Sequence, residues 1–134
     1  MTIAEILDEL DREKIERRVI ADTFYCDPPL VQKSAIARAF DHSRRLLTEV
    51  VCAAHYAHEA VRFVRDVDVK LGEIAPDLQP KFAAAIAGAT EAKVSARARN
   101  DEAAWQGYVR ACERVAYLGR VVRRIIDHSK QEAP

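Results

Sequence analysis

Between Pro29 and Gly72 the chain carries neither proline nor glycine, and apolar residues return there every three or four positions. This spacing places them on one face of a helix, because an α-helix has 3.6 residues per turn. An unbroken helix over 28–71 would be roughly 66 Å long at 1.5 Å per residue, too long for one small domain. We therefore expect it either to bend near residues 41–43, where polar side chains interrupt the apolar face, or to project and pair with another chain. The face is formed by Ile36, Ala39, Phe40, Leu47, Val50, Val51, Ala54, Ala57, Val61 and Val64.

The two ends of the chain also have helical patterns. Thr2 and Glu5 have the spacing of a capping box, which predicts a short N-terminal helix that must end before the prolines at 28 and 29. The last helix has the strongest amphipathic pattern. Its apolar face consists of Trp105, Tyr108, Ala111, Cys112, Val115, Gly119, Val122 and Ile126.

Between these helices, Gly72 and the prolines at 76 and 80 predict a loop over 72–80 that reverses the chain. An alanine-rich helix over about 79–99 follows it. Asn100 and Asp101 are suited to end this helix and to cap the next one, because both tolerate turn geometry and Asp accepts first-turn amides.

Composition supports one folded domain over residues 1–134. Hydrophobic residues make up 49% and charged residues 31%, and only four glycines are available for the turns that a many-stranded protein needs. Four helical segments with short connections predict an all-α fold, an up-and-down helical bundle of three long helices plus a shorter N-terminal helix.

The formal net charge is zero, which implies no bulk attraction to nucleic acid or to an anionic membrane. Residues 1–27 nevertheless carry eight acidic and four basic side chains, and residues 97–130 carry eight basic and four acidic ones. We expect these ends to attract each other, within one chain or between two. The absence of a long apolar run predicts no membrane span, and three cysteines without a CxxC pair are typical of reduced core thiols in a cytoplasmic protein.

One cluster of side chains on successive turns of a helix could bind a metal. Cys52, His55 and Glu59 share a helix face, and their sulfur, imidazole and carboxylate groups are possible ligands for zinc or iron. A di-iron bundle needs Glu-x-x-His on two helices, and the residue three positions after Glu49 is cysteine. The alternative is a solvated face with His58 nearer the core, and we expect no cofactor.

Arg123 and His128 form an Arg-x4-His pattern that resembles the Arg-x(4–6)-His signature of HEPN ribonucleases and toxins. The resemblance implies a metal-independent enzyme in which dimerisation places two copies of the motif in one RNA-cleaving cleft. His128 would then be the general acid or base, and Arg123 would stabilise the phosphate. Arg124 departs from the family, which often has Asn there, and no aromatic residue follows His128.

Trp105-Gln-Gly107 resembles the turn of the small secreted WXG helical hairpins. The alternative is that Gly107 lies within the last helix and Trp105 anchors the end of the bundle. The apolar face that continues from Trp105 through Tyr108 and Ala111 favours the second interpretation.

A basic stripe runs along the outer face of the last helix, interrupted by Glu113 and Asp127. Arginine beside an aromatic ring can bind phosphate and stack on a base, or bind an acidic protein surface. A solvated, salt-bridged face is the remaining interpretation. The stripe consists of Arg110, Arg114, Tyr117, Arg120 and Arg124.

The sequence contains no Gly-rich phosphate loop and no GxSxG, HExxH or CxxC motif. We therefore expect a non-enzymatic interaction protein that forms a homodimer and binds a protein or ribonucleoprotein partner, with the basic stripe and the long helix over 28–71 as the contact surfaces. The alternatives are a HEPN-like ribonuclease and a phosphate-contacting nucleic-acid-binding module.

Overall fold

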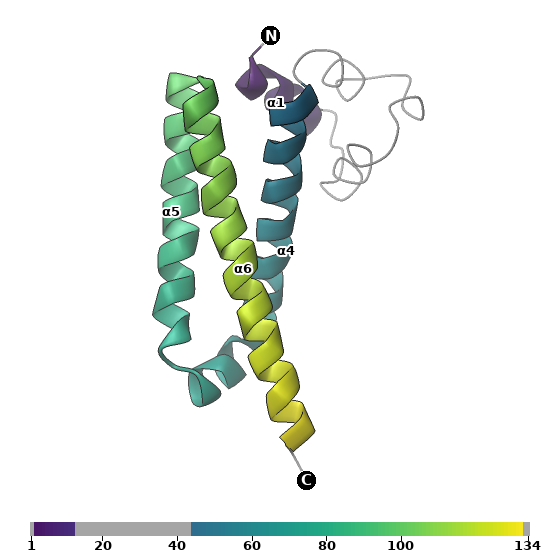
Figure 1. Cartoon of the computed structure of the whole chain (residues 1–134), viewed down its shortest axis with the longest axis vertical. Coiled ribbons are helices and arrows are strands. Elements are labelled where there is room, and N and C mark those ends of the chain that lie inside the picture. The colour runs from purple at the N-terminus through teal and green to yellow at the C-terminus, as the bar shows by residue number, and fades with distance from the viewer. Residues whose placement is uncertain (1, 13–43, 133–134) are drawn as a thin grey trace, which may run out of the picture.

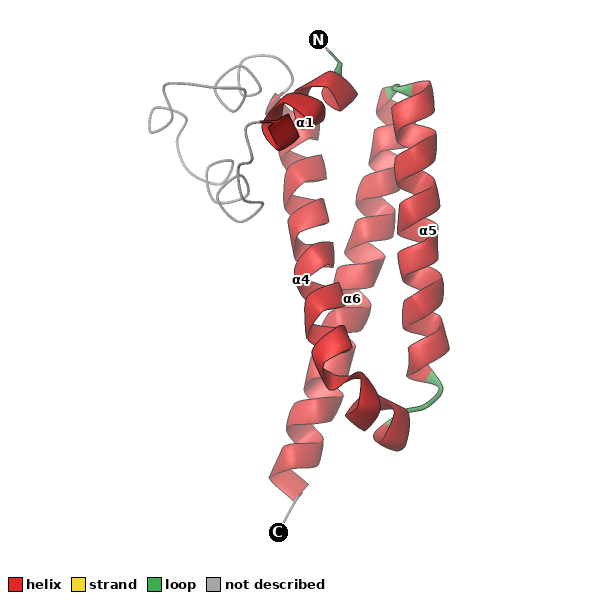
Figure 2. Ribbon diagram, turned by 180° about the vertical axis from the view of Figure 1, so that it is seen from behind, coloured by secondary structure: helices red, strands yellow, loops and turns green. Residues whose placement is uncertain are grey.

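The structure, a computed structural model, describes residues 2–12 and 44–132. Within these ranges the chain is helical apart from short turns, and no strand occurs. The short helix α1 spans Ile3–Arg12, and the long helices are α4 (Arg44–Ile74), α5 (Leu78–Arg99) and α6 (Glu102–Glu132). The three long helices run up and down; α6 lies between α4 and α5 in the upper part of both views, and lower down α4 crosses α6 toward the connection to α5 (Figures 1 and 2). For this part of the chain, the predicted all-α bundle of three long helices and a shorter N-terminal one is confirmed.

The core lies along α6, because both neighbouring helices pack on its apolar face. Contacts of α4 and of α5 with α6 are far more extensive than the contacts between α4 and α5. The predicted apolar faces are confirmed, with only Ala54, Val61 and Ala111 half-buried among their described members. Cys52 and Cys112 are buried core side chains, as predicted. The side chains that are at most 2% exposed are Leu47, Val50, Leu71, Trp105, Cys112, Val115, Val122 and Ile126, with Ala96 of α5.

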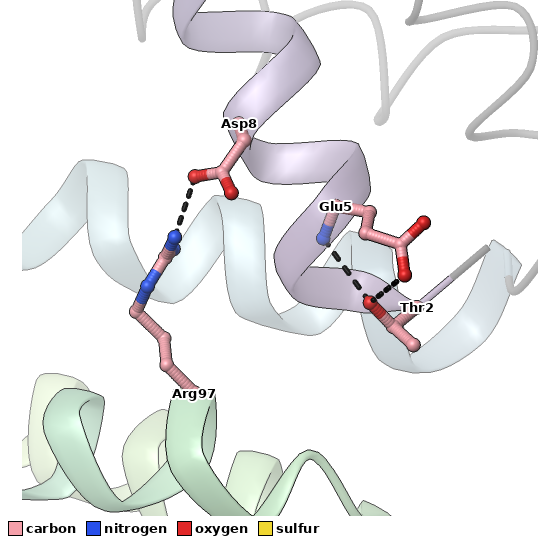
Figure 3. A network of polar contacts seen from close by, with 4 residues as sticks. All are labelled: Thr2, Glu5, Asp8 and Arg97. Carbon is pink, nitrogen blue, oxygen red and sulfur yellow. Dashed lines mark hydrogen bonds and ion pairs between the residues drawn. The ribbon is translucent and has the colours of Figure 1, made fainter.

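Helix α1 begins with the predicted cap and is tied to α5 (Figure 3). The Glu5 amide donates to Thr2 Oγ1 at 3.2 Å, and the Thr2 hydroxyl donates to the Glu5 carboxylate at 3.1 Å. The carboxylate therefore accepts from the hydroxyl rather than from the Thr2 amide. Arg97 donates to the Asp8 carboxylate, which is one intrachain contact between the acidic start and the basic end.

The connection between α4 and α5 is shorter than predicted. Gly72 lies inside α4, which continues to Ile74, and Pro80 falls in the first turn of α5, where a missing amide hydrogen breaks no helical bond. Gln79 Nε2 donates to the main-chain oxygen and to the carboxylate of Asp68, at 3.1 and 2.8 Å. A Cβ at position 72 would lie 3.2 Å from the Gln79 amide, so glycine makes room for this contact.

The turn between α5 and α6 uses the predicted residues. Asn100 adopts the left-handed conformation (φ 54°, ψ 34°), which asparagine tolerates, and its amide donates to the Ala96 carbonyl at 2.7 Å. Asp101 Oδ1 accepts from the Ala104 amide at 2.8 Å and so caps α6. Trp105 is buried and donates from Nε1 to Asn100 Oδ1 at 3.1 Å. Gly107 lies within α6 rather than in a turn, which rules out the WXG-like hairpin.

Some sequence predictions lie outside the described residues: the end of the first helix before Cys26, the helix start at 27–28, and the bend near 41–43. Among the helices that the structure describes, none combines the length and the hydropathy required to cross a membrane.

Candidate functional site

The predicted basic stripe is brought together on the outer face of α6. At 100° per residue, its five members fall within an arc of about 120°. All five are exposed, and Tyr117 exposes 56% of its surface. Within the described part of the chain, no ion pair engages any of the four arginines. Their guanidinium groups are therefore available for an external partner, although Glu113 is exposed on the same face.

A groove between α4 and α6 borders this stripe, and sequence analysis did not predict it. Its volume is about 490 Å³. Arg120 belongs to both surfaces, so the stripe and the groove form one continuous feature. The groove is lined by Tyr56, Glu59, Ala60, Arg62, Phe63 and Asp66 of α4 and by Ala116, Gly119, Arg120 and Arg123 of α6.

The groove is located where the two helices approach each other closely, at Ala60 and Gly119. A Cβ built on Gly119 would lie 2.5 Å from the Ala60 Cβ and 3.2 Å from the Ala60 Cα, so only glycine fits there. Tyr56 and Phe63 lie one turn before and after Ala60, and Arg120 and Arg123 follow Gly119 on α6. Small residues at the crossing thus form the floor, and aromatic and cationic side chains form the walls.

Arg123 is held in place by an aromatic ring. Its guanidinium carbon lies 4.1 Å from the centroid of the Phe63 ring, an exposed cation–π contact that contributes roughly 0.5–1 kcal/mol. A guanidinium placed over an aromatic ring still has N–H donors for a carboxylate or phosphate. Phe63 therefore positions Arg123 for an anionic group in the groove.

The groove carries a small positive excess. The groove lining includes three positive groups, Arg62, Arg120 and Arg123. It also includes two negative ones, Glu59 and Asp66. The Arg65–Asp66 ion pair beside the groove is long, at 4.0 Å, and largely exposed, so it neutralises Asp66 only weakly. The exposed side of Tyr56 adds an aromatic surface at the edge of the groove.

The HEPN-like pair is not brought together within one chain. Arg123 lies on Phe63 at the groove, whereas His128 follows five residues later and so projects about 140° away around the helix. His128 is exposed and does not line the groove. A shared phosphate contact by both side chains of one copy is incompatible with this placement.

The candidate metal ligands are also separated by their surroundings. Cys52 is buried in the core, and Glu59 is exposed at the groove. His55 is half-buried, and its buried Nδ1 atom has no hydrogen-bond partner among the residues that the structure describes. Across residues 2–12 and 44–132, no group of three or more ligand side chains converges on a possible metal position. The prediction that His58 lies nearer the core is wrong: His58 is exposed, because the rotation of α4 turns His55 inward instead.

Sequence reasoning missed Tyr56, Arg62 and Phe63. Their only signal was the repetition of aromatic and arginine residues on α4, and nothing in the sequence aligned that helix with Arg120 and Arg123. Comparison with protein-family models, with curated proteins and with solved structures finds no match for this chain.

Proposed function

We propose that this chain is a non-enzymatic, cytoplasmic interaction protein that self-associates and binds a negatively charged partner, a protein or a ribonucleoprotein. The observation that carries the proposal is the continuous surface formed by the stripe and the groove. It combines arginines that have no ion pair within the described residues with exposed Tyr56 and Tyr117. We call this combined feature the arginine surface.

The arginine surface is suited to oxyanions. An arginine can donate two parallel hydrogen bonds to a carboxylate or a phosphate, and an exposed tyrosine adds stacking area. Phe63 fixes Arg123 at one end of the surface, which lowers the entropy lost when a partner binds. Glu59, Asp66 and Glu113 oppose indiscriminate binding of polyanions, which fits a protein of zero net charge.

The ribonuclease alternative requires Arg123 and His128 to act on one phosphate. Within one copy only Arg123 lies at the groove, so a shared site would need His128 of a second copy. No observation favours the enzyme as a second function.

Fluorescence anisotropy with two probes tests the proposal: a labelled single-stranded RNA and a labelled acidic peptide of equal charge. We expect salt-sensitive binding of at least one probe. The double variant R120Q/R124Q should weaken it by about tenfold or more, because two unpaired donors are lost. For RNA, the salt slope should become shallower by about 1.4, at 0.7 per phosphate contact.

The matched control is K70Q/K130Q, which removes the same charge from exposed positions of α4 and α6 outside the groove and the stripe. This control should bind like the unmodified chain. The proposal is wrong if neither probe binds at low salt, or if both double variants lose affinity equally.

A further inference from the structure

The outer side of α5 borders the arginine surface at Arg114 and exposes many small side chains. A helix on a protein surface usually separates a polar exposed side from an apolar buried side, whereas α5 distributes polar and apolar residues evenly around its circumference. It buries only Phe82, Ala85 and Ala96 within the bundle, while Val94 is 66% exposed. This distribution is typical of a helix with a second packing partner. The other exposed small residues are Ala83, Ala84, Ala87, Gly88 and Ala98.

Two glycines show where such a partner would approach. A Cβ at Gly119 would collide with Ala60, and one at Gly72 would crowd the Gln79 side chain, so both glycines have a neighbour within the chain. A Cβ at Gly88 or Gly107 would meet nothing within 4 Å. Glycine inside a helix is destabilising relative to alanine. Gly88 and Gly107 therefore weaken their helices with no compensating contact in the described chain.

Gly88 lines a groove of about 290 Å³ between α5 and α6. Gly107 lies one turn before Ala111, on the same side of α6. Both walls thus present small side chains, which allow another helix to approach closely, since the interaxial distance depends on the side chains at the contact. The lining residues are Lys81, Ala84, Ala85, Gly88, Ala111 and Arg114.

The charges on this face identify its occupant. Four exposed residues follow one another on α5 at intervals of three, four and three positions: Lys81, Ala84, Gly88 and Glu91. This spacing is the same in both chain directions. Neither Lys81 nor Glu91 forms an ion pair within the described residues. An antiparallel second copy centred at position 86 would place each lysine opposite a glutamate, and each Ala84 opposite a Gly88. A parallel copy would place like charges together.

We propose that α5 pairs with α5 of a second copy in an antiparallel, twofold-symmetric contact. Two Lys81–Glu91 ion pairs flank the close contacts of Ala84 with Gly88. The same patch on both copies is self-complementary, as a twofold interface requires. This inference names the surface for the self-association included in the proposed function, and it rests on that part of the proposal.

Charge reversal tests the contact by sedimentation equilibrium. The unmodified chain should dimerise, and K81E and E91K should each raise the dimer Kd by about tenfold or more, because like charges then face each other twice. The double variant K81E/E91K restores both pairs and should return the Kd to within about threefold. A one-to-one mixture of the single variants should form heterodimers. Unchanged dimerisation of the single variants, or no recovery in the double variant, would overturn the contact.

A steric test uses the open glycine. Gly88→Leu should abolish dimerisation while leaving helicity unchanged, because a Cβ at this position has no atom of the described chain within 4 Å. Ala83→Leu, an exposed α5 position outside the groove, is the matched control and should dimerise normally. A dimer that persists in every variant refutes this surface but not self-association. A monomeric unmodified chain refutes both, and the anisotropy test of the arginine surface then decides separately whether partner binding stands.

Discussion

The packed interface between α4 and α6, the seam, differs from the outer side of α5 in the size of its apolar side chains. Along the seam, large apolar side chains recur at helical spacing, and Gly119 lets the two backbones meet at Ala60. On α5 the apolar residues are mostly alanine, and Gly88 faces open space. The same residue type is thus required by packing in one helix and unexplained by packing in the other. Alanine substitution should therefore have opposite effects at the two positions.

The largest expected effect is at the seam. Gly119→Ala places a methyl group 2.5 Å from the Ala60 Cβ, and the α4 backbone 3.2 Å away limits how far the helices can relax. We expect overpacking to lower the free energy of unfolding by about 2 kcal/mol, despite the better helix propensity of alanine. Urea denaturation followed by circular dichroism measures the change.

The control is the reciprocal substitution Ala60→Gly. Alone it should cost about 1 kcal/mol through helix propensity. Combined with Gly119→Ala it removes the closest atom, so the double variant should be more stable than the sum of the single effects predicts. Strict additivity would show that the two helices do not meet at these residues.

The second prediction concerns the open glycine. Gly88→Ala should raise the free energy of unfolding of the monomer by up to about 1 kcal/mol, because the added methyl group meets nothing and the unfolded chain loses freedom. Denaturation at concentrations below the dimer Kd isolates this effect. At higher concentration the same substitution should weaken the dimer, since it fills the position opposite Ala84.

Gly107→Ala provides the matched comparison on α6, where an added Cβ also has open space. It should stabilise the monomer by a similar amount. If Gly88→Ala destabilised the dilute monomer instead, the outer side of α5 would be in contact with its own chain, and the contrast with the seam would disappear.

Most of the bundle could be predicted because its signals are local. Three features depend only on residues within one or a few helical turns. They are the cap at Thr2, the turn at Asn100 and Asp101, and the apolar face from Trp105 to Ile126. Gly72 was misassigned to a loop because its role depends on Gln79 packing back onto α4, a contact that neighbouring residues do not reveal.

Only one half of the arginine surface could be predicted from the sequence. The stripe on α6 follows from helical spacing, but the groove depends on how α4 is rotated and aligned against α6. Tyr56 and Phe63 lie some sixty residues from Arg120 and Arg123, and no periodicity relates the two segments. The same unknown rotation explains why His55, rather than His58, turns inward.

The smallest expected effect concerns the contact of α1 with the inner side of α5, which sharpens the contrast with its open outer side. Asp8 and Arg97 expose 44% and 35% of their side chains, so solvent screens the pair and we expect a coupling of about 0.5 kcal/mol. A double-mutant cycle with D8N and R97Q measures it by urea denaturation, and the coupling should shrink as salt is added. D11N removes an exposed charge from the same helix and should show no coupling to R97Q. A coupling above about 2 kcal/mol would mean that the pair is shielded from water, and that α1 holds α5 in place far more firmly than its exposed position indicates.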